Sequence, residues 1–256
     1  MSKGIDCATP LTVKTVKAIA AAGYGFAARY LVPPGYSKRL KLAEAEAITA
    51  AGMQIVSVYE TTANRPNGGA SAGAEDGVKA FQEAKSIGQP IGSAIYFAVD
   101  YEALSKDYDK IEAYLRAVAV VLRGYAVGVY GSYAVIEEMA KRGVAKHFWQ
   151  TYAWSYGKKS VKANIYQHLN GQIVGGVTVD FNQSFGNEGW WNTKKTPKPE
   201  PNNEVKTMNE VDANMIIKKH LQPEYAAAKK NGDSKSAKEA HRLANELRKA
   251  SGQPLK

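Results

Sequence analysis

The stretch AIYFAVDYEAL, residues 94–104, decides the fold of this protein. Six apolar or aromatic residues come first, which is typical of a buried strand of a parallel sheet, and two carboxylates follow soon after. A helical pattern over 107–123 comes next. Because a buried strand followed by a helix is the repeating unit of α/β folds, this stretch predicts that class, and the same alternation continues on both sides of it.

Eight β-rich runs lie between the N-terminus and Asn192, at 3–8, 25–32, 53–60, 92–102, 126–133, 146–154, 163–169 and 175–183. Helical patterns separate the first five, at 11–22, 39–51, 74–87 and 107–123, and a shorter one covers 134–142. The connections 155–162 and 170–174 are too short for a crossover helix, so we expect loops or hairpin turns there. The chain therefore predicts an α/β fold: a (β/α)8 TIM-like barrel over 1–191, irregular in its second half.

The C-terminal part has a different composition. Residues 192–207 are rich in proline and lysine, which is typical of an extended linker. Beyond them, 208–256 has helical patterns at 209–221, from Pro223 and after Asp233, which predict a small all-α module. Residues 1–191 carry 20 basic and 16 acidic side chains, whereas 192–256 carry 14 and 8, so the tail has the denser positive charge.

The net charge of +10 suits an anionic partner, which can be nucleic acid, a membrane surface or a phosphate-rich wall polymer. Nucleic acid is the weaker candidate, because the tail has no recognisable reading helix or aromatic platform. No stretch has ~20 uninterrupted apolar residues and the N-terminus lacks a signal pattern, so we expect no transmembrane segment and synthesis in the cytoplasm. Cys7 is the only cysteine and the four histidines lack ligand spacing. We therefore expect a buried thiol, no metal and no cofactor.

In parallel barrels the active site lies at the C-terminal ends of the strands, so polar residues at those ends should meet at one mouth. The residues that end or follow the eight runs are Asp6, Arg29, Tyr30, Tyr59, Glu60, Asp100, Glu102, Tyr130, Gln150, Tyr152, Trp154, Gln167, Asp180 and Asn182. For Tyr130, Tyr152 and Trp154, stacking on sugar rings and packing in the core stay equally open. We expect Trp149 in the core, and Trp190 and Trp191 at the bottom or edge of the barrel.

Asp100 and Glu102 are two residues apart, so on a strand both carboxylates face the same cavity. Paired carboxylates are what glycosidic cleavage needs, one to protonate the leaving oxygen and one to stabilise the cationic sugar. We assign Glu102 as the acid and Asp100 as the stabilising group, with Asp6 and Asp180 holding the shape and charge of the site. The alternatives are a solvated acidic loop and a carboxylate cluster for a divalent metal.

Six segments resemble, in order, the strand motifs of the family 25 glycoside hydrolases and of the related glycoside-hydrolase-like TIM-barrel domains. They are GIDCA (4–8), YFAVDYE (96–102), GVYGSY (128–133), WQTYAW (149–154), YQ (166–167) and VDFN (179–182). The resemblance implies an N-acetylmuramidase that cuts the β-1,4 bond between N-acetylmuramic acid and N-acetylglucosamine. Its acidic quartet falls on Asp6, Asp100, Glu102 and Asp180. Strand one departs from the family, because it reads GIDCA where the lysozymes usually have GIDVS.

A barrel, a proline-rich linker and a small basic module also resemble the layout of phage endolysins. That layout implies peptidoglycan glycan strands as substrate, with anionic wall polymers bound through 208–256. It also implies action on the wall after release from the cytoplasm, through a holin or from outside. The alternative is a barrel that binds wall glycan and does not cleave it.

Overall fold

The computed structural model describes residues 1–194 and 210–255. The chain divides into two compact units, Met1–Lys194 and Lys195–Lys256. The linker expected at 192–207 lies outside the described residues except for its first three. No described helix is long and apolar enough to cross a membrane.

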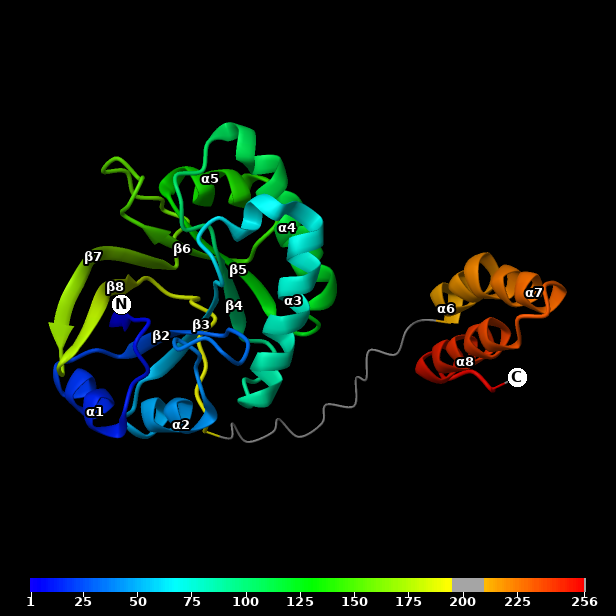
Figure 1. Ribbon diagram of the computed structural model, residues 1–256, viewed down its shortest axis with the longest axis horizontal. Helices are drawn as coiled ribbons and strands as arrows, with labels where there is room; N and C mark the ends of the chain where they lie inside the picture. The colour runs from blue at the N-terminus through cyan, green and yellow to red at the C-terminus, as the bar shows by residue number, and fades with distance from the viewer. Residues whose placement is uncertain (195–209, 256) are drawn as a thin grey trace. The chain divides into compact units, whose positions relative to one another are not determined.

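Eight strands of the first unit close into a barrel in sequence order (Figure 1). They are β1 (Lys3–Asp6), β2 (Phe26–Tyr30), β3 (Gln54–Tyr59), β4 (Ala94–Ala98), β5 (Ala126–Gly131), β6 (His147–Thr151), β7 (Ile165–Val174) and β8 (Val177–Ser184). Neighbours from β1 to β7 pair in parallel, whereas β8 runs antiparallel to both β7 and β1. The predicted α/β barrel with an irregular second half is confirmed.

Five helices belong to this unit: α1 (Val13–Ala21), α2 (Leu42–Ala50), α3 (Gly69–Ser86), α4 (Tyr108–Val121) and α5 (Tyr133–Lys141). The side chain of Thr12 caps α1 and that of Ser132 caps α5, each accepting a backbone N–H of the first turn. Short single 3-10 turns precede α3 and α4, at Arg65–Gly68 and Ser105–Asp107. The helices therefore follow the first five strands, as the sequence predicts.

The last two strands form a hairpin in place of a helical crossover. Gly175 and Gly176 join β7 to β8 with φ angles of 61° and 79°. A two-residue hairpin turn of this hand requires positive φ at both positions, which glycine adopts without a steric penalty. The segment 175–176 thus explains why β8 reverses direction and closes the barrel against β1.

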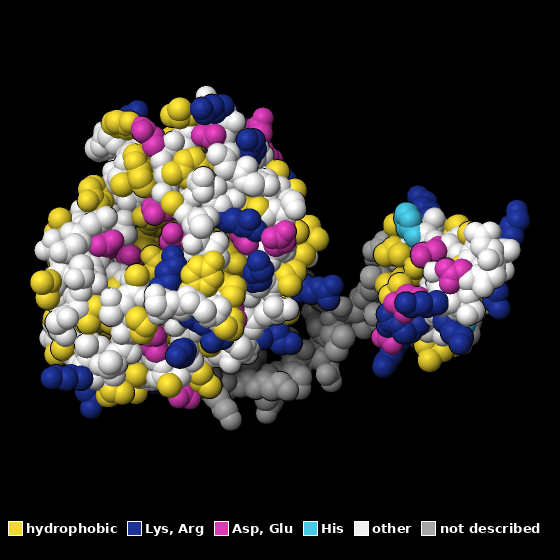
Figure 2. Space-filling view, viewed as in Figure 1, with side chains coloured by type: hydrophobic (Ala, Val, Ile, Leu, Met, Phe, Trp, Pro, Cys, Tyr) yellow, Lys and Arg dark blue, Asp and Glu magenta, His cyan; other side chains and the backbone are white. Residues whose placement is uncertain are grey.

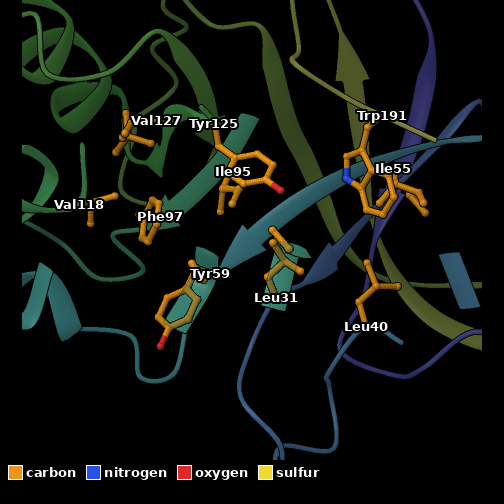
Figure 3. Close-up of a cluster of buried hydrophobic side chains, with 14 of the residues drawn as sticks. Leu31, Leu40, Ile55, Tyr59, Ile95, Phe97, Val118, Tyr125, Val127 and Trp191 are labelled. Atoms are coloured by element: carbon orange, nitrogen blue, oxygen red, sulfur yellow. The ribbon is translucent and has the colours of Figure 1, made fainter. Parts of the chain in front are cut away.

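Alternate side chains along each strand enter two different hydrophobic layers. Phe26, Ala28, Tyr96 and Trp149 belong to the interior of the barrel. Their sequence neighbours belong to the layer between the strands and the helices, part of which Figure 3 shows, with Ile55, Ile95 and Phe97 from the strands and Val118 from α4. This alternation decides which strand-end residues can reach the mouth.

The last residues of the first unit cover the N-terminal ends of the strands. Trp191 is buried, pairs with Ile55 near the start of β3 and donates its indole N–H to Ser57 Oγ at 2.8 Å. Trp190 packs against Phe26 at the start of β2. Both tryptophans therefore lie at the end of the barrel opposite the mouth, and Trp149 is buried as expected.

The second unit is helical, as predicted for the C-terminal part of the chain. Its described elements are α6 (Glu210–Ile216), which continues through a π-helical turn (Ile217–Leu221) into α7 (Gln222–Lys230), and α8 (Ser234–Ala250). Asp233 caps α8 by accepting the N–H groups of Lys235 and Ser236, each at 3.1 Å. Within this unit, α7 packs against α8.

Candidate functional site

A cavity of about 130 Å³, called here the mouth cavity, opens at the C-terminal ends of the strands. It is lined by Asp6, Tyr30, Val58, Glu60, Ala98, Asp100, Tyr130, Trp149, Gln167, Asn170 and Asp180. Acidic side chains gather around a hollow in the barrel unit in Figure 2. Of the predicted quartet, the structure brings Asp6, Asp100 and Asp180 together here, and it adds Glu60.

Asp6 is the most deeply placed carboxylate of the mouth cavity, with 6% of its surface exposed. Its Oδ2 accepts hydrogen bonds from Asn182 Nδ2 at 2.7 Å and Gln167 Nε2 at 2.9 Å. Burial raises the pKa of Asp6 to about 7; the two amides oppose that rise, and the negative charges of Asp180 and Asp100 add to it. Asp6 can therefore hold or release a proton near neutral pH.

Asp180 and Asp100 are partly exposed at the same cavity. Burial raises the pKa of Asp180, whose Oδ1 accepts the N–H of Gly171 at 2.8 Å. Burial also raises the pKa of Asp100, as does the negative charge of Glu60. Glu60 itself pairs with Lys38 at 3.4 Å. The mouth thus concentrates acidic groups that can stabilise a positive charge.

Two polar side chains hold the carboxylates in place. Gln167 Oε1 accepts from the hydroxyls of Tyr130 at 2.9 Å and Thr151 at 2.8 Å, which leaves its amide N–H groups to face the carboxylates. Asn182 Oδ1 accepts the indole N–H of Trp149 at 2.8 Å. Gln167 lines the cavity, as predicted, whereas Asn182 is buried behind Asp6 and supports it.

Glu102 lies elsewhere. The prediction that it shares a cavity with Asp100 is wrong, because β4 ends at Ala98 and strand alternation does not extend to these residues. Glu102 is exposed and accepts a hydrogen bond from the Tyr156 hydroxyl. It lines a second cavity of about 190 Å³, next to Trp154 and Tyr156. Its role as the acid stays a prediction.

Six predicted substrate-binding residues do not line the mouth cavity: Asn182, Tyr152, Trp154, Arg29, Tyr59 and Gln150. The last three point away from it. Arg29, Tyr59 and Gln150 are each the sequence neighbour of an inward-facing residue and so point into the outer layer. Tyr59 contacts Asp76 of α3 at 3.4 Å, and Gln150 donates to Lys158 O at 2.8 Å. Tyr30, Glu60 and Tyr130 do line the cavity, whereas Tyr152 is 42% exposed on the loop after β6.

Arg29 forms a buried ion pair whose contribution to stability can be tested. Its fully buried guanidinium pairs with Glu44 at 2.6 Å and donates to the carbonyls of Cys7 and Lys38. Arg29→Met leaves a buried carboxylate without its cation, so we expect a loss of roughly 3–5 kcal/mol of folding free energy. Urea denaturation measures it.

The matched control is Arg39→Met, because the Arg39–Glu83 pair at 2.6 Å is partly exposed and should cost ~1 kcal/mol. Equal small losses in both variants would show that the Arg29 pair is not needed for the fold.

Four residues in or beside the two cavities were not predicted from the sequence: Lys38, Tyr156, Lys158 and Asn170. Asn170 lines the mouth cavity, and Lys38 lies over the Tyr30 ring at 4.1 Å. A signal for the other two was present, because WSYGKK (154–159) puts aromatic and basic residues in a loop directly after a strand end. Among the described residues, no group of three or more His, Cys, Asp or Glu is arranged to hold a metal ion.

Comparisons with known proteins agree with this fold. The model of the family described as "Rv2525c-like, glycoside hydrolase-like domain" matches residues 17–216, more than half of the chain. The structure of the Mycobacterium tuberculosis protein Rv2525c with L-tartrate is similar, with a TM-score of 0.69 and 29% identity. That match covers 74% of this chain and 98% of the other. The sequence resemblance to glycoside-hydrolase-like barrels is confirmed.

Two further matches cover less than half of the other protein's length. FadG of Bacillus subtilis is 29% identical over 155 residues, which are 56% of this chain and 27% of FadG. The modular autolysin LytC of Streptococcus pneumoniae, solved with a synthetic peptidoglycan ligand, has a TM-score of 0.53 at 15% identity. The match covers 71% of this chain and 46% of LytC. At 15% identity it shows a shared fold and nothing more.

Proposed function

Since the chain belongs to the Rv2525c-like family of glycoside hydrolase-like domains, we propose that it hydrolyses peptidoglycan glycan. The bond attacked is the β-1,4 link between N-acetylmuramic acid and N-acetylglucosamine. The observation that carries the proposal is the meeting of Asp6, Asp100 and Asp180 in one cavity at the mouth of the barrel. Such a cluster stabilises the positive charge that develops on a sugar ring during cleavage.

In this proposal Glu102 protonates the leaving oxygen as the bond between that oxygen and the sugar carbon breaks, and a water molecule then adds to the carbon. The side chain of Glu102 is exposed, and exposed side chains change rotamer within nanoseconds. A bound glycan can therefore replace the Tyr156 hydroxyl as the hydrogen-bond partner of Glu102. Asp100 stabilises the sugar cation, and Asp6 and Asp180 set the charge of the site.

A barrel that binds wall glycan without cleaving it is the second candidate. The observation in its favour is that Glu102 lines a different cavity from the three aspartates. Both candidates require the protein to reach the wall after synthesis, and both leave the basic helical unit as an anchor for anionic wall polymers.

The deciding experiment treats purified Gram-positive peptidoglycan with the full chain, reduces the products with borohydride and analyses the soluble fragments by mass spectrometry. We expect fragments that end in reduced N-acetylmuramic acid and are absent from a buffer control. Fragments ending in reduced N-acetylglucosamine would mean a different glycosidic bond. Intact glycan with the protein pelleted on the wall would establish the binding candidate instead.

A further inference from the structure

The loop after β3, residues 60–68, lies beside Asp100. It begins with Glu60, which lines the mouth cavity. Three residues later, the carbonyl of Ala63 accepts the backbone N–H of Asp100 at 3.1 Å. The pairing of β4 with β5 ends at Ala98, so it stops short of Asp100. The loop after β3 therefore supplies the hydrogen bond that holds the Asp100 backbone.

The carboxylate of Asp76, on α3, anchors this loop. Asp76 is 1% exposed, and its two oxygens accept hydrogen bonds from the guanidinium of Arg65 at 2.8 and 3.1 Å. The hydroxyl of Tyr114 on α4 donates to Asp76 at 2.9 Å, and that of Tyr59 on β3 donates at 3.4 Å. Asp76 thus joins the loop to a neighbouring helix and to the barrel wall, through a two-pronged pair of the kind that fixes geometry.

Two glycines of α3 explain how Tyr114 reaches Asp76. The helices α3 and α4 lie side by side (Figure 1). A Cβ atom on Gly73 would meet the backbone of Tyr114, and one on Gly77 would meet Val121. Because glycine has no side chain, α4 approaches closely enough for the Tyr114 hydroxyl to donate across the helix interface.

The buried charge of Asp76 makes the position of Arg65 definite. A carboxylate in the core is costly unless a cation pairs with it, so Asp76 restricts where the guanidinium can lie. Arg65 opens the short 3-10 turn Arg65–Gly68 and also pairs with Glu75 at 2.8 Å. Only one residue separates Arg65 from Ala63. The ion pair therefore also restricts the carbonyl that holds Asp100.

We propose that Asp76 and Arg65 are positioning residues for Asp100. They hold the loop after β3 in place, and the loop fixes the Asp100 backbone and keeps Glu60 beside it. This inference rests on the proposed function, in which Asp100 stabilises the sugar cation. Neither Asp76 nor Arg65 lines the mouth cavity, so both act through the loop.

The charges around Asp100 make its position measurable. Burial raises the pKa of Asp100, and the negative charges of Glu60 and Asp180 add to the rise. The ammonium of Lys38 opposes it. Lys38 belongs to the loop after β2 and lies over the Tyr30 ring at 4.1 Å, so it stays when the loop after β3 moves. Release of that loop exposes Asp100 and frees Glu60, and the pKa of Asp100 should then fall.

The test is a carbon-13 NMR titration of the aspartate carboxyls in the full chain, with the Asp100 signal assigned by its loss in Asp100→Asn. The variant Arg65→Met with Asp76→Asn removes both charges together, so no unpaired carboxylate is left in the core. We expect the pKa of Asp100 to fall in this double variant. The pKa of Asp180, whose carboxylate accepts the N–H of Gly171, should stay as in the wild type. A role in folding alone would lower the folded fraction and move neither pKa.

Cleavage gives a second readout. In the double variant, kcat on soluble glycan oligomers should fall roughly 10- to 100-fold while KM changes little, because Asp100 acts on the charge of the transition state. Arg65→Lys is the milder variant for the case that the double variant does not fold. Its ammonium keeps Asp76 paired but cannot fork across both oxygens, so the pKa of Asp100 should fall by less.

The matched control is Arg142→Met with Glu138→Gln, which removes a partly exposed pair of 2.8 Å at the end of α5. Neither residue lines the mouth cavity, so the pKa of Asp100 should not change. An unchanged pKa of Asp100 both in Arg65→Lys and in the double variant would overturn the inference.

The two proposals fail separately. A fall in the pKa of Asp100 in a protein whose wild type releases no fragments would keep the positioning role and reject the hydrolase. Fragment release by the wild type, together with an Asp100 pKa that the variants leave unchanged, would keep the hydrolase and reject the positioning role.

Discussion

Glycan cleavage should fall by roughly 10²–10⁴-fold when Glu102 is replaced by glutamine. Glutamine has nearly the same shape as glutamate, and its carbonyl oxygen can still accept the Tyr156 hydrogen bond, but its amide cannot donate an acidic proton to the leaving oxygen. The initial rate of reducing-end formation from purified peptidoglycan measures the effect. Pelleting on intact walls should be unchanged, because the fold and the mouth cavity do not depend on this exposed side chain.

The matched control for this variant is Glu46→Gln, which removes an exposed carboxylate from α2 and should cleave at the wild-type rate. Full activity of Glu102→Gln would contradict the assigned role. If Asp6→Asn were then inactive, proton donation would belong to Asp6, whose pKa of about 7 also fits an acid at neutral pH.

The second large effect concerns stability, and Asp6→Asn should produce it. Burial raises the pKa of Asp6 from 3.8 to about 7. Between these two pH values the folded state therefore holds a proton that the unfolded state releases. The stability that this proton contributes is complete below pH ~4 and is lost as the pH rises through 7. Asparagine has no such dependence, and its carbonyl oxygen can accept the bonds from Asn182 and Gln167.

We therefore expect the stability of Asp6→Asn relative to the wild type to rise by roughly 2–3 kcal/mol between pH 5 and pH 8. In thermal unfolding this corresponds to a relative gain of roughly 5–10 °C in the melting temperature. The variant should gain stability while it loses cleavage, as expected for a residue kept for function. Glu46→Gln should show no such pH dependence, and a constant difference between Asp6→Asn and the wild type would show that Asp6 is charged throughout this range.

The alternation of side chains along a strand decides which residues line the mouth, and the sequence already contains it. Strand side chains alternate, so Arg29 and Tyr30 cannot both face the interior, and neither can Tyr59 and Glu60. Tyr30 and Glu60 line the cavity, whereas Arg29 and Tyr59 are buried against the helices. Arg29 and Tyr59 are polar residues at a strand end, but alternation turns both away from the mouth.

Glu102 is a different case, because its placement depends on where β4 stops. The apolar run extends to Val99, but pairing ends at Ala98, and the residues beyond follow the course of the loop. The loop after β6 then supplies Tyr156 as the partner of Glu102, 54 residues away in the chain. Neither residue type nor spacing could indicate that contact.

By itself, the sequence determined the class of fold and the order of strands and helices, because hydrophobic periodicity is a local property. The last turn was expected at 170–174, but those residues belong to β7 and the chain turns at Gly175 and Gly176 instead. The sequence also determined that Asp6, Asp100 and Asp180 would meet, since barrel closure brings the ends of the first, fourth and last strands to one mouth. Only the tertiary structure decided the burial that raises the pKa of Asp6 and the separation of Glu102 from Asp100. Those features depend on burial and on contacts between residues as far apart as Asp6 and Asn182, and no local pattern encodes them.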